Sequence, residues 1–149
     1  MTPEQRARAV AEAMWAQDSA SKWAGIELVE IGEATAVMAL TVAARHCNGH
    51  GICHGGVTYM LADSAFAYAC NSRNQSTLAR HNSITYTAPG RLGDRLTATA
   101  SEVALNGRSG IYDVAVTNQD GTTVARFRGL SRAVKGRYVD ESEGEEAAE

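Results

Sequence analysis

The residue types that could perform chemistry gather in one short stretch, and Asp63 stands out among them. With histidine counted as neutral, Asp63 is the only charged side chain between Arg45 and Arg73. It interrupts a run over residues 55–70 that is apolar on every side of a helical wheel, a pattern typical of a helix surrounded by other structure. A lone carboxylate there costs free energy unless it is paired or used. A chemical role is therefore the first hypothesis for Asp63.

A second chemical group is predicted at the start of this helix, where the chain reads His54-Gly55-Gly56. The first turn of a helix carries unpaired N–H groups and the positive end of the helix dipole, which suit an oxygen that becomes negative during a reaction. Gly55 and Asp63 are eight residues apart, or roughly 12 Å along a helix, too far for both to contact one small reacting group. Two such helices lying antiparallel across a two-fold axis would bring Asp63 of one chain to Gly55 of the other. We predict an obligate homodimer with two shared sites.

Structural roles compete with these chemical ones. The Asp63 carboxylate could be satisfied by the hydroxyl of Ser64 or Thr58, and His54 could be a plain N-terminal cap. Asn48, in the loop before the helix, could be an ordinary turn residue. The same loop also crowds five metal-ligand types into residues 46–54, but Gly49 and Gly51 argue against a helix and the spacing matches no common zinc pattern. We expect no metal. The five are His46, Cys47, His50, Cys53 and His54.

The elements that position these groups follow from patterns along the chain. Thr2 with Gln5 forms a capping box for a helix over residues 3–17, and residues 18–25 read as a turn that buries Trp23 and ends at Gly25. Two strands over 26–31 and 35–42 form a hairpin, and the buried helix starts at His54 and ends near Asn71 or Asn74. Later strands are expected at 77–88, 92–105, 109–119 and 122–134, as an antiparallel meander. This predicts an α+β fold in which five to six antiparallel strands curl around one long buried helix.

Two longer segments of the sequence are specific enough to indicate a protein family. The segments 48–56 (NGHGICHGG) and 61–71 (LADSAFAYACN) resemble the hotdog-fold acyl-CoA thioesterases, most of all those of the phenylacetic acid degradation type. The resemblance extends over most of residues 10–136 and includes segments 88–90, 110–113 and 125–129. A His-Gly-Gly motif with an Asp eight residues after its first glycine is more specific than either part alone.

The resemblance implies a hotdog fold and roles for particular residues. It implies that Asp63 is the nucleophile or general base, that the Gly55 N–H polarises the thioester carbonyl, and that Asn48 and His54 help to position this carbonyl or the attacking water. Two-fold dimers that pair into tetramers are common in this family. Aryl-acetyl-CoA, such as phenylacetyl- or hydroxyphenylacetyl-CoA, is the implied substrate, and no cofactor is expected.

Substrate contacts are harder to place. We expect Gly56, Arg91 and Arg108 to contact the substrate or its coenzyme A, with Arg132 and Lys135 as further candidates for the phosphates. The acyl pocket has four aromatic candidates: Tyr59, Phe66, Tyr68 and Trp23. The family also carries a hydroxyl on the strand after the helix that helps to hold water. Thr77 could supply it, whereas Ala79 at that position would be a departure.

Composition supports one domain over residues 1–136, followed by an acidic tail over 137–149 that we expect to be disordered. The tail supplies 6 of the 17 acidic groups and leaves a formal charge of +3 on residues 1–139, which suits an anionic ligand. The basic residues are too few and scattered for nucleic-acid binding. The longest apolar run is too short to span a bilayer. The residues at the start of the sequence predict no signal peptide, and the odd number of cysteines suits the cytoplasm.

Two other functions remain open from the sequence. One is an acyl-CoA dehydratase or hydratase of the same fold, in which His54 would be a base near the acyl chain. The other is a non-catalytic acyl-CoA sensor that keeps the pocket without turnover. Retention of Asp63 weighs against a sensor, and we expect no DNA-binding extension before the domain.

Overall fold

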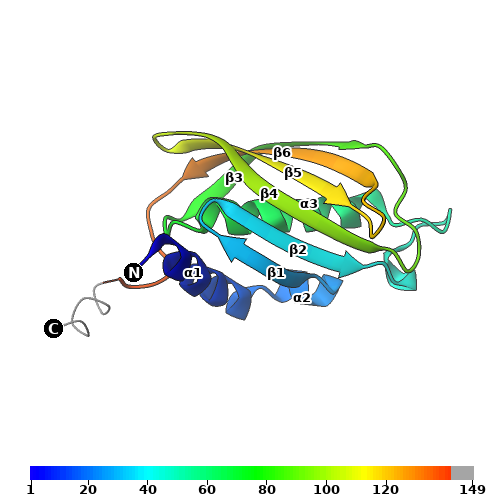
Figure 1. Cartoon of the computed structure of the whole chain (residues 1–149), viewed down its shortest axis with the longest axis horizontal. Coiled ribbons are helices and arrows are strands. Elements are labelled where there is room, and N and C mark those ends of the chain that lie inside the picture. Colours follow the sequence, from blue (N-terminus) through cyan, green and yellow to red (C-terminus); the bar gives the residue numbers. More distant parts are fainter. Residues whose placement is uncertain (142–149) are drawn as a thin grey trace.

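A six-stranded antiparallel sheet and one long central helix make up the fold (Figure 1). The structure is a computed structural model and describes residues 1–141. Strand order is β1-β2-β4-β5-β6-β3, and every neighbouring pair is antiparallel. The predicted α+β hotdog architecture is therefore confirmed. The elements are α1 (Pro3–Gln17), α2 (Ser19–Ala24), β1 (Glu27–Gly32), β2 (Thr35–Thr41), the 3-10 helix η1 (Ala44–His46), α3 (Gly55–Asn71), β3 (Thr77–Tyr86), β4 (Arg95–Asn106), β5 (Ser109–Thr117) and β6 (Thr123–Ala133).

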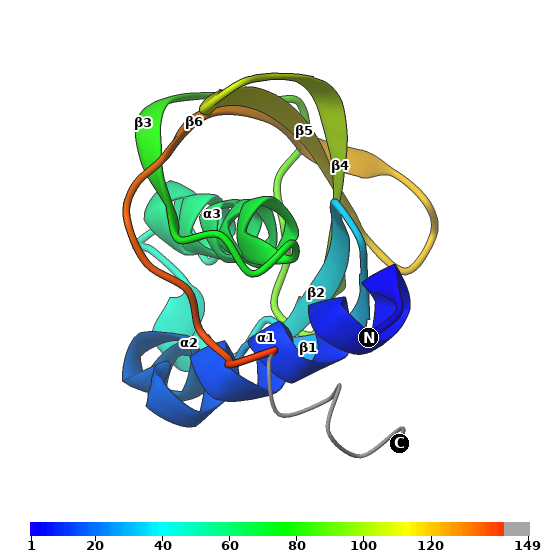
Figure 2. The same cartoon turned by 90° about the vertical axis from the view of Figure 1, so that its left-hand side faces the viewer.

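Helix α3 lies inside the curve of the sheet, as the view along its axis shows (Figure 2). Leu61, Ala65 and Phe66 are almost completely buried, because the sheet covers α3 on several sides and the helix is apolar nearly all round. Phe66 packs so tightly on β6 that a Cβ at Gly129 would lie 2.7 Å from its ring. This close packing holds α3 in one place relative to the strands.

The N-terminal region confirms one expectation and corrects another. Thr2 and Gln5 form the predicted capping box of α1. Residues 18–25, however, are not a plain turn: they form the short helix α2, which ends at Gly25 with φ 82°. The prediction that Trp23 is buried is wrong, since it is 80% exposed. Ser21 and Ala24 face inward at helical spacing and so turn Trp23 outward. Six residues are too few for that periodicity to be recognised.

The order of the last strands also differs from a simple meander. Strands β4, β5 and β6 do form consecutive antiparallel pairs, as the Asn106-Gly107 and Asp120-Gly121 turns predict. Strand β3 instead pairs with β6 and lies at the edge of the sheet. The segment after β3, which contains Pro89 and Gly90, passes β6 and β5 to reach β4, which lies between β2 and β5. It is longer than the two-residue turns that join neighbouring strands.

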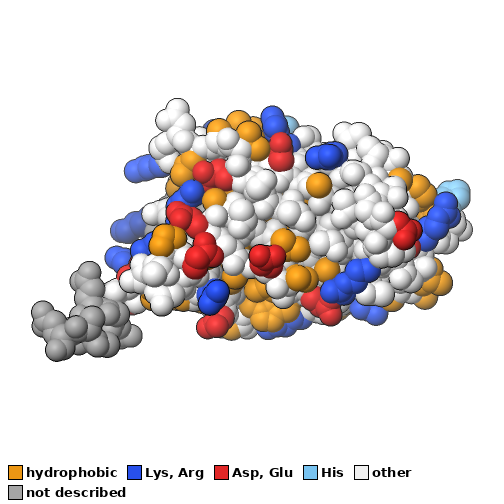
Figure 3. All heavy atoms as spheres, viewed as in Figure 1, with side chains coloured by type: hydrophobic (Ala, Val, Ile, Leu, Met, Phe, Trp, Pro, Cys, Tyr) orange, Lys and Arg blue, Asp and Glu red, His pale blue; other side chains and the backbone are white. Residues whose placement is uncertain are grey.

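Part of the predicted tail packs against the domain. The Asn74 side chain accepts from the Tyr138 and Val139 N–H groups, and Arg6 pairs with Glu141 at 2.7 Å. Residues 142–149 lie outside the described residues, so the expected disorder of the tail stays a prediction. On the face shown in Figure 3, Lys and Arg side chains are interspersed with Asp and Glu side chains. Within residues 1–141, no helix is long and apolar enough to cross a membrane.

Candidate active site

The N-terminus of α3 presents an unused hydrogen-bond donor. His54 is the N-cap, and its Nδ1 accepts from the Gly56 N–H at 2.8 Å. The Val57 and Thr58 N–H groups both donate to the His54 carbonyl oxygen. No described residue accepts from the Gly55 N–H, so this donor remains for a ligand. A Cβ at Gly55 would lie 3.1 Å from the Tyr86 ring, so a larger residue there would have to displace Tyr86.

Asn48, a candidate from the family resemblance, lines the same cavity as Gly55. This cavity of about 400 Å³ is also lined by Tyr86 of β3. The Asn48 side chain is also a turn residue, because its Oδ1 accepts from the His50 N–H at 2.9 Å. Its Nδ2 has no partner among residues 1–141 and remains as a donor. The turn therefore holds the Asn48 side chain through its Oδ1, and the Nδ2 that could contact a substrate carbonyl is not used.

Asp63 lies half-buried near the middle of α3. Burial raises the pKa of its carboxyl above the ordinary value, and a hydrogen bond from Asn82 Nδ2 to Asp63 Oδ1 at 3.1 Å partly opposes this rise. The two hydroxyls considered as structural partners are engaged elsewhere. Ser64 Oγ lies 3.3 Å from Ser21 Oγ, and Thr58 donates to the Cys53 sulfur. Among the described residues, Asn82 is therefore the side chain that hydrogen-bonds to the Asp63 carboxyl.

One unbroken helix carries both chemical groups. Since α3 is continuous from Gly55 to Asn71, the eight residues between Gly55 and Asp63 separate them by roughly 12 Å. A thioester carbonyl within hydrogen-bond distance of the Gly55 N–H is thus out of reach of Asp63 in the same chain. Within one chain, these two groups therefore cannot act on the same carbonyl.

The comparison with protein families decides the class of protein. Residues 50–125 match the model of the thioesterase superfamily. The chain belongs to the thioesterase superfamily. The matched segment includes His54, Gly55 and Asp63 and extends to the start of β6, so it contains the whole helix and most of the sheet. Membership in this family confirms the predicted class of enzyme, a thioester hydrolase.

Similar proteins of known name and structure agree with this assignment. Acyl-coenzyme A thioesterase PaaI of Escherichia coli is 42% identical over 132 residues, covering 89% of this chain and 94% of that protein. The structure of E. coli PaaI, from the phenylacetic acid degradation operon, superposes with a TM-score of 0.90 and covers 91% of this chain and 99% of that one, at 41% identity. The smu.793 protein of Streptococcus mutans bound to acetyl-CoA has a TM-score of 0.72 at 25% identity, covering 75% and 90%.

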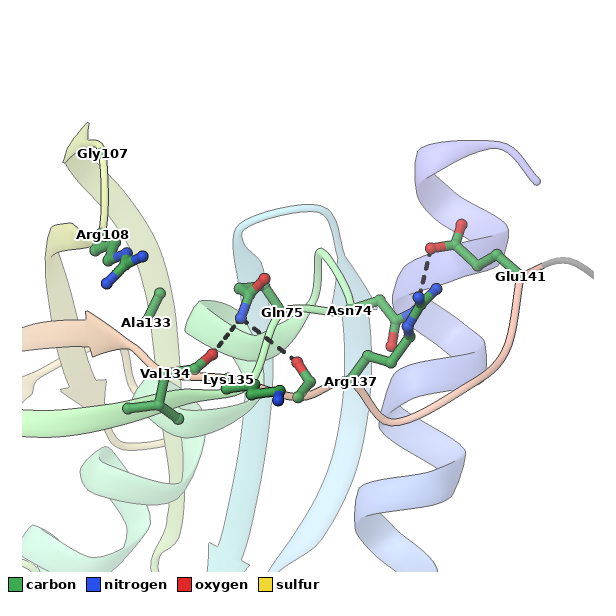
Figure 4. A pocket seen from close by; sticks show the side chains of 10 residues that line it. Asn74, Gln75, Gly107, Arg108, Ala133, Val134, Lys135, Arg137 and Glu141 are labelled. Carbon is green, nitrogen blue, oxygen red and sulfur yellow. Dashed lines mark hydrogen bonds between the residues drawn. The ribbon is translucent and has the colours of Figure 1, made fainter.

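The basic candidates lie at opposite ends of the thioesterase domain. Arg91 is exposed beside the loop that carries Asn48, since it forms a β-bridge with Ile52. Arg108 lines a cavity of about 850 Å³ near the C-terminal end of α3, together with Lys135 and Arg137 (Figure 4). Within one chain, the structure does not bring Arg91 and Arg108 together. Gly56 is exposed at the helix start, where a Cβ would lie 3.0 Å from the His54 ring.

Sequence reasoning missed Asn82 and Tyr86, both on β3. Asn82 contacts Asp63, and Tyr86 Oη donates to the Gly55 carbonyl oxygen at 2.7 Å. The hydroxyl sought on this strand does not come from Thr77, whose Oγ1 donates to the Gln75 carbonyl oxygen. Ala79 is exposed and carries no hydroxyl. The alternation of side chains along β3 could have suggested that a polar residue of this strand partners Asp63. It could not show which residue faces inward.

Two of the five side chains in residues 46–54 that are of a metal-binding type already have other partners. His46 is buried and bonds the Ala24 carbonyl oxygen and the Ala43 N–H through its two ring nitrogens. His54 uses Nδ1 as the helix cap. Among residues 1–141, no group of three or more His, Cys, Asp or Glu side chains is arranged to hold a metal ion.

The raised pKa of Asp63 predicts a pH-dependent cost to stability. A carboxyl with a higher pKa in the folded state holds its proton more tightly there, so its ionisation destabilises the fold as the pH rises through that pKa. Asp63→Asn removes this ionisation. We expect the variant to unfold at the same or a higher temperature than wild type at pH 7, and the difference to disappear below about pH 4, where the unfolded carboxyl is also protonated. Thermal unfolding followed by circular dichroism between pH 3.5 and 8 tests this. A large loss of stability at pH 7 would show that Asp63 is structural.

Proposed function

We propose that the protein hydrolyses aryl-acetyl-CoA thioesters to the free acid and CoA. It does so as a homodimer with two sites, each combining Asp63 of one protomer with the Gly55 N–H of the other. Asn48 and His54 belong to the Gly55 half of each site. A tetramer made of two such dimers fits the same proposal.

One observation carries the proposal: an unpaired N–H and a carboxyl with a raised pKa lie on one helix, too far apart to serve a single carbonyl. Thioester hydrolysis needs both a donor for the developing oxyanion and a base or nucleophile. A two-fold axis across antiparallel α3 helices supplies both groups to each site. The edge position of β3 beside α3 leaves this side of the domain open to a second copy.

The chemistry can follow two balanced routes. In the first, Asp63 takes a proton from water while the water oxygen adds to the carbonyl carbon, and the resulting oxyanion accepts from the Gly55 N–H. The carbon–sulfur bond then breaks, and the CoA thiolate receives the proton from Asp63. In the second, an Asp63 oxygen adds to the carbonyl carbon, CoA leaves, and water hydrolyses the mixed anhydride. The raised pKa suits a base and also the return of the proton to the thiolate.

Coenzyme A recognition follows from the same dimer. An antiparallel arrangement of α3 brings the Gly55 end of one protomer to the Asp63 half of the other, and Arg91 lies at the first end while Arg108 lies beyond the second. Both arginines would then border one site. We propose that Arg108, with Lys135 and Arg137 in the cavity of Figure 4, neutralises CoA phosphates and that Arg91 approaches the CoA from the other protomer.

The aryl-acetyl group is proposed from the similarity to E. coli PaaI and from the aromatic residues near Asp63. Tyr59 is half-buried, bonds the amide of Asn82 and lies edge-on to Phe127 with ring centroids 5.5 Å apart. Of the four aromatic candidates, Tyr59 is therefore the one that we propose contacts the aryl group. Phe66 and Tyr68 are core residues, and Trp23 lies on the surface.

The central test is release of free thiol from a panel of acyl-CoA thioesters: aryl-acetyl, benzoyl and straight-chain. We expect hydrolysis by wild type to be fastest with an aryl-acetyl group. Asp63→Asn should reduce kcat by at least about a hundredfold, because it removes the base or nucleophile while keeping the size of the side chain. Near wild-type turnover by Asp63→Asn would refute the assignment. Tight binding without thiol release by either protein would favour a sensor, and addition of water to an enoyl-CoA would favour a hydratase.

Shared sites can be tested by mixing two inactive variants. Asp63→Asn removes the carboxylate, and Gly55→Pro removes the N–H donor. In a mixed dimer one site carries both defects and the other carries none. Random exchange makes half of the dimers mixed, so activity should return to about one quarter of the wild-type value. Each variant alone is the control, and circular dichroism checks that Gly55→Pro is folded. A mixture that stays inactive after exchange, or an active monomer in sedimentation, contradicts the shared site.

The role of Arg108 can be separated from catalysis. We expect Arg108→Ala to raise KM for acyl-CoA about fivefold with little change in kcat, because an exposed ionic contact contributes about 1 kcal/mol. The effect should vanish with the same acyl group on N-acetylcysteamine, which lacks the phosphates. Arg8→Ala, on the exposed surface of α1, is the matched control. Equal effects on both thioesters would show that Arg108 does not contact the nucleotide part of CoA.

A further inference from the structure

Helix α3 and strand β3 touch at two points whose spacings match. Tyr86 Oη bonds the Gly55 carbonyl oxygen at 2.7 Å, and Asn82 Nδ2 bonds Asp63 Oδ1 at 3.1 Å. The two contacts are eight residues apart on the helix, or roughly 12 Å, and four residues apart on the strand, or roughly 13 Å. Strand β3 therefore runs along the face of α3 that carries both chemical groups.

A bulge sets which side chains of β3 face the helix. The pairing of β3 with β6 shifts between Ala79 and His81. Beyond it, Asn82 and Ile84 are half-buried, whereas His81 and Ser83 are exposed. Because side chains alternate along a strand, a register shift of one residue would turn Asn82 away from Asp63 and bring His81 or Ser83 to its place.

The amide of Asn82 lies between Tyr59 and Asp63. Its nitrogen donates to both Tyr59 Oη at 2.9 Å and Asp63 Oδ1 at 3.1 Å. Its oxygen is buried and has no hydrogen-bond partner among the described residues, an arrangement that costs free energy. The reverse orientation would place the amide oxygen against a carboxylate oxygen, and both are acceptors. The fold therefore tolerates an unpaired oxygen at Asn82 while Asp63 receives a donor.

This donor acts against the effect of burial. Desolvation disfavours the charged carboxylate and raises the pKa of Asp63, whereas the Asn82 hydrogen bond favours the charged form and lowers that pKa. The hydrogen bond also restricts rotation of the carboxyl. No other side chain among the described residues bonds Asp63, so one contact provides both effects.

We infer that Asn82 is a positioning residue for the reaction: its amide, held by Tyr59, orients the Asp63 carboxylate and keeps it ionised. The inference rests on the proposed role of Asp63. Asn82 acts through Asp63 and does not itself contact the reacting atoms. Its loss should therefore change the protonation of Asp63 more than the binding of substrate.

The test is the pH dependence of kcat/KM for Asn82→Leu, which keeps the approximate size of the side chain and removes the donor. We expect the acid limb of the profile to move up by about one pH unit, because the carboxyl loses a stabilising partner of its ionised form. KM should change less than about threefold, as expected of a residue that does not bind substrate. Asn82→Gln retains an amide donor, so its acid limb should lie between those of Asn82→Leu and wild type. Ser83→Ala, the exposed neighbour on the same strand, is the matched control and should leave the limb unchanged.

A second measurement separates this inference from the proposed function. Carbon-13 NMR of the labelled Asp63 carboxyl, without substrate, should show a pKa about one unit higher in Asn82→Leu than in wild type. An unchanged pKa in both Asn82→Leu and Asn82→Gln would overturn the inference whatever the activity. A higher pKa with an unmoved acid limb would also overturn it, because Asn82 would then tune a carboxyl that the reaction does not use. Failure of the proposed function would appear separately, as full activity of Asp63→Asn.

Discussion

The structure depends on one constraint, which is that a rigid helix surrounded by a sheet must carry a carboxylate near its middle. A helix of this kind is stable because its apolar side chains are removed from water, and an ionised group there works against that gain. The consequence is visible at Asp63, whose pKa is raised by burial. Because the helix cannot bend, the donor at its start and the carboxylate remain roughly 12 Å apart. A two-fold partner is the simplest way to unite them.

Three polar groups near this face of α3 have incomplete hydrogen bonding within the described residues. They are the Gly55 N–H, the Asn48 Nδ2 and the Asn82 Oδ1. Nearly all buried polar groups in folded proteins are hydrogen-bonded, so the buried Asn82 Oδ1 is an exception that needs an explanation. The surrounding core supplies the stability that offsets the cost of this unpaired oxygen. Phe66, packed against Gly129 of β6, is one example of how closely that core is filled.

Strand β3 contributes to the site as well as to the sheet. On one side it pairs with β6 along nine residue pairs, and on its inward face it contacts α3 through Tyr86 and Asn82. An edge strand is usually free to vary, but here its register decides which side chain meets Asp63. The bulge between Ala79 and His81 is thus tied to the chemistry through the alternation of side chains.

Much of the fold, and the two groups of the proposed site on α3, were readable from the sequence alone. The capping box at Thr2, the glycine turns, the long apolar helix and the lone Asp63 are local signals, because they depend on neighbouring residues and on helical spacing. The eight-residue spacing of Gly55 and Asp63 also predicts a dimer. Tertiary structure decided the rest. It placed β3 at the sheet edge beside β6, turned Trp23 outward and separated Arg91 from Arg108 within one chain. It also identified Asn82 as the partner of Asp63, since strand order and the phase after a bulge depend on contacts between segments far apart in the chain.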